Sequence, residues 1–107
     1  MIEKTEDIFN NSIESNYSKS VSMEHRKKFA QFFTPFPIAK LMAQWILDNK
    51  QLKTVLEPAF GLGIFSRAIL NYKKDVEIKG FEIDKTIFEY SKEYFLNFEN
   101  VNIFLQA

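Results

Sequence analysis

Residues 55–66 read VLEPAFGLGIFS, a stretch in which a short apolar run meets a turn with two glycines. The run over 54–58 is typical of a strand, and an apolar stripe at helical spacing begins at Ile64. Glycine permits a tight turn and lets a ligand come close to the backbone. In open α/β sheets such a turn lies beyond the carboxyl end of a strand, where ligands bind. This stretch therefore predicts a strand, a ligand-binding turn and a helix in succession.

The neighbouring segments also alternate between predicted strands and predicted helices. Apolar, β-branched runs at 76–81 and 101–105 predict two further strands, and helices are predicted near 34–48, 64–72 and 85–98. Alternation of this kind favours a parallel sheet with right-handed crossovers. We therefore expect an α/β fold, part of a Rossmann-like sheet with about three parallel strands flanked by helices. A doubly wound sheet has its first strand in the middle, so the first strand would have an open side here.

The segment before the turn predicts more helix. Residues 1–17 have a loose apolar face, and residues 18–22 are typical of a break. Thr34 and Pro35 favour a helix start, because threonine can cap a helix and proline suits its first turn. Trp45 lies at helical spacing with other apolar residues, so we expect it in the core. Asp84 is placed to cap the last predicted helix.

Composition excludes several classes of protein. The 107 residues include 14 basic and 14 acidic side chains, and this zero net charge argues against a strongly basic nucleic-acid surface in the segment. The absence of cysteine excludes disulfides and thiolate metal sites and fits an intracellular, cytoplasmic location. The N-terminus does not resemble a signal peptide, and no apolar run approaches the roughly 20 residues of a membrane span. We assign no metal site.

Two carboxylates mark the expected site. Glu82 ends the second predicted strand, about 20 positions after the glycine turn, where an acidic residue typically binds ribose hydroxyls. Glu57 precedes the turn and would repel the pyrophosphate of a dinucleotide. S-adenosylmethionine (SAM) has a ribose, no phosphate, and cationic groups that Glu57 would attract. The pair predicts SAM as the cofactor, and the alternative role of Glu57 is to cap the helix that begins near Gly63.

Four segments, in order, resemble motifs of a known family. QFFTPFPIAKLM, VLEPAFGLGIFS, IKGFEID and NIFLQA are similar to successive motifs of the gamma-class SAM-dependent DNA adenine-N6 methyltransferases of restriction–modification systems. The resemblance covers residues 26–107. It implies that the parent protein transfers a methyl group from SAM to adenine in DNA. The Thr-Pro segment ahead of the glycine turn is the part that indicates DNA as the substrate.

The resemblance also implies roles for individual residues. Thr34 would help to hold the methionine end of SAM, Glu82 would bind the ribose, and Ile83 would pack against the adenine. Further cofactor-binding residues are expected along the turn: Glu57, Pro58, Ala59, Phe60, Gly61 and Gly63. Ala30, Phe60 and Leu62 depart from residues common in the family, and we expect these departures to change only the fine shape of the pocket.

The sequence lacks the catalytic loop of that family. Family members carry an Asn/Asp-Pro-Pro-Tyr/Phe loop that holds the extruded adenine, and no Pro-Pro dipeptide occurs here. We therefore expect residues 1–25 to be an N-terminal helical extension and linker, and residues 26–107 to be an incomplete SAM-binding domain. No catalytic residue is assigned. DNA would be bound by parts of the parent protein absent here, and the chain alone is expected to be inactive.

Other functions remain as alternatives. The parent could be a SAM-dependent methyltransferase that acts on protein or on a small molecule, or the chain could be a non-catalytic remnant that serves assembly. An NAD-dependent dehydrogenase is a more distant alternative, because Glu57 should discourage NAD binding. An unpaired apolar strand edge also invites association, so we expect the isolated chain to associate with itself and to have no membrane partner.

Overall fold

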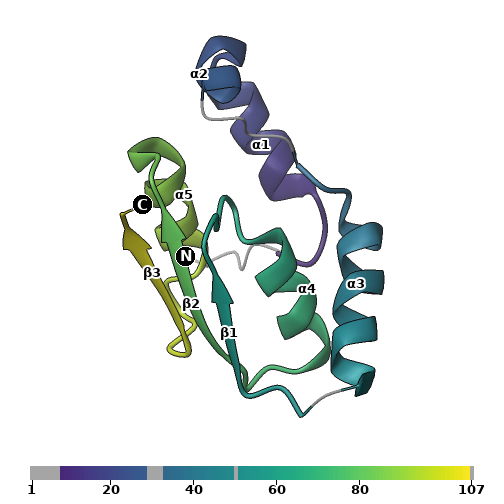
Figure 1. Ribbon diagram of the computed structural model, residues 1–107. Helices are drawn as coiled ribbons and strands as arrows, with labels where there is room; N and C mark the ends of the chain where they lie inside the picture. Colours follow the sequence, from purple (N-terminus) through teal and green to yellow (C-terminus); the bar gives the residue numbers. More distant parts are fainter. Residues whose placement is uncertain (1–7, 29–32, 50, 107) are drawn as a thin grey trace, which may run out of the picture.

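The computed structural model describes residues 8–28, 33–49 and 51–106 (Figure 1). One sheet contains three parallel strands in the order β1-β2-β3, where β1 is Thr54–Glu57, β2 is Glu77–Glu82 and β3 is Val101–Leu105. Two helices connect the strands, α4 (Ile64–Tyr72) after β1 and α5 (Lys85–Tyr94) after β2. Three helices precede the sheet: α1 (Ser12–Ser20), α2 (Met23–Lys28) and α3 (Phe36–Asn49). The predicted α/β fold is confirmed.

The strand register brings the carboxyl ends of β1 and β2 to the same edge of the sheet. Glu57, the last residue of β1, pairs with Gly80 of β2, and Glu82 follows two positions later. Within the described ranges β1 pairs with β2 alone, so its other edge is open, as the sequence predicts. In Figure 1, α1 and α2 lie beyond the ends toward which the strand arrows point.

Phe60 packs the glycine turn onto the sheet. Its ring is 2% exposed and makes an edge-to-face contact with Phe95, with 5.4 Å between the ring centroids. A Cβ added to Gly80 would lie only 2.1 Å from the Phe60 ring, and one added to Gly63 would lie 2.6 Å from it. Gly63 also has a φ of +74°, which disfavours other residues. Glycine at these two positions therefore makes room for the buried ring.

The prediction that Trp45 lies in the core is wrong, because its side chain is 72% exposed. α3 packs beside α4 in Figure 1, and its buried positions are Phe36, Ala39 and Ala43. Ala39 and Ala43 on the buried face of α3 are small, so they leave room for α4 to approach. The bulkier apolar residues of α3 therefore face outward, at Ile38, Leu41, Met42 and Trp45.

The N-terminal extension packs against the sheet domain. Tyr17 of α1 is fully buried and makes an edge-to-face contact with Tyr90 of α5, with 5.1 Å between the centroids. α1 continues to Ser20, so the predicted break over 18–22 begins later than expected. Residues 1–7 of the predicted first helix lie outside the described residues, and residues 8–11 are not helical, because α1 begins at Ser12. The domain division after residue 25 stays a prediction. No helix in the described ranges has the length and apolar character needed to cross a membrane.

We predict that Gly80→Ala lowers the free energy of unfolding substantially. The new Cβ must displace the buried Phe60 ring, and overpacking of this kind typically costs about 1–3 kcal/mol. Urea denaturation followed by circular dichroism measures the change. Lys79→Ala, at the exposed neighbouring position of β2, is the control and should alter the free energy by no more than about 0.5 kcal/mol. Equal effects of the two substitutions would contradict the packing of Phe60 on Gly80.

Candidate cofactor-binding site

The glycine turn joins the ends of β1 and β2 through its own backbone groups. The Phe60 N–H donates to the Phe81 carbonyl of β2 (2.9 Å), and the Gly63 N–H donates to the Phe60 carbonyl (2.8 Å). The Gly61 N–H donates to Glu82 Oε1 (2.8 Å), and Ser91 Oγ donates to the Gly61 carbonyl. A phosphate-binding turn directs its N–H groups at the ligand. Here the amides of both turn glycines are engaged within the protein.

The Glu82 carboxylate holds the turn against β2. Its Oε2 accepts hydrogen bonds from the N–H groups of Ile83 (3.1 Å) and Asp84 (3.0 Å), while Oε1 accepts the one from Gly61. A carboxylate has about four acceptor positions, so three are used. The side chain is 9% exposed. Oε1 therefore keeps one acceptor position that these backbone groups do not use.

Glu57 is the last residue of β1, and its side chain contacts the start of α4. Its Oε1 accepts a hydrogen bond from Ser66 Oγ (2.5 Å), and the Ser66 N–H is also bonded to this carboxyl group. The structure thus supports the alternative role of Glu57 as a helix cap. Burial raises the pKa of Glu57 to about 7, and the Ser66 hydrogen bonds and the Arg67 charge oppose that rise. A cation beside Glu57 would favour its ionised form, so capping and cation binding are compatible.

The remaining predicted residues take different positions. Pro58 and Ala59 are exposed on the turn, and Ile83 is 64% exposed directly after Glu82. The Phe60 side chain lies in the core, so any ligand contact of this residue would come from its backbone. Thr34 is half-buried just before α3, and its carbonyl accepts a hydrogen bond from Asn11 Nδ2 (3.3 Å). The departure at Ala30 lies outside the described residues.

Two polar contacts in the same region were missed by the sequence analysis. The Phe36 N–H donates to Asn11 Oδ1 (2.6 Å), so the cap of α3 comes from the residue before α1 and not from Thr34. Arg67 of α4 is fully buried and donates from Nε to the Leu62 carbonyl of the turn (3.1 Å). An arginine within the apolar stripe of a helix is the one sequence signal that could have indicated this contact.

The comparisons with known proteins agree with this geometry. Residues 3–102 match the family model of the N-6 DNA methylases. The chain belongs to the N-6 DNA methylase family. The type II methyltransferase M.AccI of Acinetobacter calcoaceticus is 74% identical over 106 residues, which are 99% of this chain. The chain spans only 20% of the length of M.AccI.

Solved structures share the fold at lower identity. A putative caffeoyl-CoA O-methyltransferase from Staphylococcus aureus is 21% identical with a TM-score of 0.61, and the match covers 94% of this chain and 52% of that one. A putative RNA methyltransferase from Pyrococcus horikoshii is 25% identical with a TM-score of 0.58, over 72% of this chain and 40% of that one. These matches establish a Rossmann-like methyltransferase fold.

We predict that Glu57 makes the fold less stable as pH rises from about 4.5 to about 7. In this range the folded chain keeps a proton on Glu57 that the unfolded chain has released, so higher pH favours unfolding. Glu57→Gln removes this dependence, and the variant should gain stability relative to the parent chain between about pH 5 and about pH 8. Urea denaturation at several pH values measures it.

The control for this measurement is Glu89→Gln, which changes an exposed glutamate of α5. Its free energy of unfolding should follow that of the parent chain at every pH. If Glu57→Gln also follows the parent chain throughout the range, the surroundings of Glu57 do not raise the pKa of its carboxyl group.

Proposed function

We propose that this chain is the cofactor-binding part of a SAM-dependent DNA adenine-N6 methyltransferase of the restriction–modification type. The observation that carries the proposal is the pair of glutamates at the carboxyl ends of two adjacent parallel strands, next to a turn whose glycine amides are already engaged. Such a site is unsuited to a phosphate and suited to a positively charged nucleoside. Family membership and the 74% identity to a type II methyltransferase support DNA as the substrate.

The residues of the site fit SAM in the following way. Glu82 Oε1, which already accepts the Gly61 N–H, would accept a hydrogen bond from a ribose hydroxyl. The exposed Ile83 side chain would pack against the adenine, and Glu57 would attract the cationic groups. Thr34 helps to hold the methionine end. The backbone of residues 58–63 shapes the turn around the ligand. When bound, SAM supplies the methyl group, and the residues named here bind and orient it.

The other steps of the reaction belong to the rest of the parent protein. No residue of this chain is assigned a catalytic role, and the chain is 20% as long as M.AccI. The pocket for the extruded adenine and the DNA-binding surface would come from the remaining length, and the chain alone would be inactive. A cytoplasmic location fits an enzyme that acts on cellular DNA. A dehydrogenase role is disfavoured, because Gly61 and Gly63 do not offer their amides to a pyrophosphate.

We predict that the chain binds SAM and that Glu82→Gln weakens this binding by about tenfold or more, since the new amide cannot accept hydrogen bonds from both the turn and a ribose at full strength. Isothermal titration calorimetry measures the affinity. Glu77→Gln is the matched control, because Glu77 is an exposed glutamate at the opposite end of the same strand. Its affinity should equal that of the parent chain.

Two results would contradict the proposed function. One is NAD binding that is as tight as SAM binding. The other is a chain that is folded by circular dichroism and shows no SAM binding at concentrations far above the usual range for this cofactor, which would favour the non-catalytic remnant.

We also propose that isolated chains associate through the open edge of β1. This edge borders a hollow of about 300 Å³ with an almost wholly apolar lining. It is formed by Met42, Ala43, Ile46, Val55, Leu56, Glu57, Phe65 and Ile69. Two copies related by a twofold axis would pair their β1 edges and cover this apolar surface.

The association prediction is tested by light scattering as a function of concentration. The parent chain should increase in apparent mass, and Leu56→Lys should remain a monomer, because a charge on the edge strand opposes pairing. Leu96→Lys, which changes another exposed leucine beyond α5 (75% exposed, against 63% for Leu56), is the control and should associate like the parent chain. A monomeric parent chain at high concentration would contradict the proposal.

A further inference from the structure

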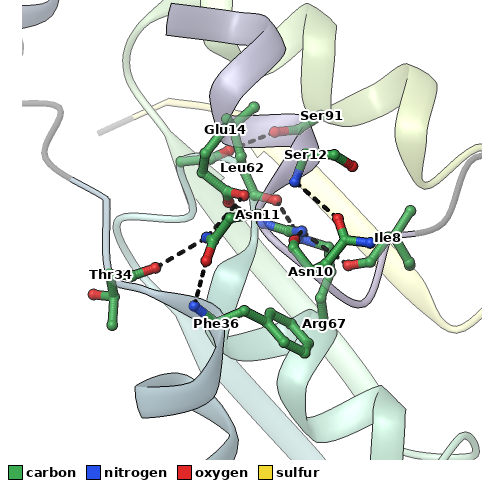
Figure 2. A network of polar contacts seen from close by, with 11 residues as sticks. Ile8, Asn10, Asn11, Ser12, Glu14, Thr34, Phe36, Leu62, Arg67 and Ser91 are labelled. Carbon is green, nitrogen blue, oxygen red and sulfur yellow. Dashed lines mark hydrogen bonds and ion pairs between the residues drawn. The ribbon is translucent and has the colours of Figure 1, made fainter.

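A continuous network of buried and half-buried polar groups connects the glycine turn to the N-terminal extension (Figure 2). Its centre is Arg67 of α4, which is fully buried. Besides the Nε bond to the Leu62 carbonyl, Nη1 donates to the carbonyls of Ile8 (2.9 Å) and Asn10 (3.0 Å), and Nη2 forms an ion pair with Glu14 of α1. One guanidinium therefore joins the turn, the segment before α1, and α1 itself.

Asn11 extends the same network to the Thr-Pro segment, residues 34–35. Its Nδ2 donates to Glu14 Oε1 and to the Thr34 carbonyl, each at 3.3 Å, and its Oδ1 accepts the Phe36 N–H. Figure 2 shows these side chains converging between α1, α4 and the start of α3. The Thr-Pro segment and the glycine turn, which are far apart in the sequence, are thus connected by Asn11, Glu14 and Arg67.

Stability alone does not account for this arrangement. Burial lowers the pKa of the Arg67 guanidinium, and Glu14 opposes the shift by pairing with the charge. Well-packed apolar residues in place of a buried ion pair are often equally stabilising or better. Apolar side chains cannot hold three carbonyl groups from two chain segments, as the branched guanidinium of Arg67 does. With apolar residues in place of the ion pair, these backbone groups would no longer be fixed in position.

We propose that α1 is a positioning element of the cofactor site and that Arg67 and Asn11 are its positioning residues. Arg67 fixes the Leu62 carbonyl at the centre of the glycine turn, and Asn11 fixes the backbone of Thr34 and Phe36. Together they hold the two halves of the site in one geometry before the ligand binds, which lowers the ordering cost of binding. This inference rests on the proposed function only where it concerns SAM.

The test compares local opening of the turn with global opening of the fold. Amide hydrogen exchange followed by NMR reports on Gly61 and Gly63, whose N–H groups are bonded within the turn region, and on Ile78, whose N–H donates to the Asn100 carbonyl in the centre of the sheet. SAM affinity is measured by calorimetry on the same samples. A structural anchor without a positioning role would change exchange at all three amides together.

Two variants remove the positioning contacts. Arg67→Lys keeps the charge opposite Glu14 and loses the fork. Arg67→Met combined with Glu14→Leu replaces the ion pair by apolar side chains and remains available if the lysine variant does not fold. We expect exchange at Gly61 and Gly63 to rise by about tenfold or more, with exchange at Ile78 nearly unchanged. SAM affinity should fall by a similar factor.

Asn11→Ala should also weaken SAM binding, through the Thr-Pro segment, while Asn16→Ala on the exposed face of α1 should not. Unchanged exchange at both glycines, or a uniform rise that includes Ile78, would overturn the inference. The exchange measurement needs no ligand. A chain that fails to bind SAM therefore contradicts the proposed function, while the exchange data still decide whether Arg67 positions the turn.

Discussion

The glycine turn depends on one requirement: its backbone N–H groups need hydrogen-bond acceptors, and the protein itself supplies them. Glu82 supplies one acceptor to Gly61, and the Phe60 carbonyl supplies one to Gly63. The hydrogen bond from Gly61 to Glu82 and the one from Phe60 to Phe81 hold the turn against the end of β2. Because the N–H groups of Phe60, Gly61 and Gly63 are engaged, the turn does not direct these donors at a ligand. The proposed preference for a cationic nucleoside rests on this difference from a phosphate-binding turn.

The core below the turn reinforces the same geometry. Phe60 can occupy its buried position only because Gly80 and Gly63 carry no side chain. The ring reaches Phe95 just beyond α5, so the turn is packed against the element that follows β2. Ser91 of α5 adds a hydrogen bond to the Gly61 carbonyl. Hydrophobic packing therefore fixes the backbone from below, while the polar network of Arg67 fixes it from the side of α1.

Sequence reasoning predicted the parts of this structure that depend on local pattern. Alternating apolar runs indicated three strands, and Asp84 caps α5 as expected, by accepting the Thr86 N–H (3.0 Å). The acidic residues at both strand ends also follow from spacing, because parallel strands place their carboxyl ends together. These features need no knowledge of which helix lies beside which.

The features that sequence reasoning missed all depend on long-range neighbours. Helical spacing identified an apolar stripe on α3 that includes Trp45, but α3 meets α4 through its alanines, so the bulky stripe faces outward. Thr34 is a suitable cap by residue type, yet Asn11 provides the cap from 25 residues away in the sequence. Arg67 lies within the apolar stripe of α4, but its partners before and within α1 cannot be identified from the helical spacing. A single sequence does not contain that information.

A crystal structure of this chain with S-adenosylhomocysteine tests the central claim most directly. We expect the ribose to lie within hydrogen-bond distance of Glu82 Oε1, the adenine to cover Ile83, and the amino-acid end to extend past Glu57 toward Thr34. A nucleoside bound elsewhere, with Glu82 still bonded only to the backbone, would contradict the account.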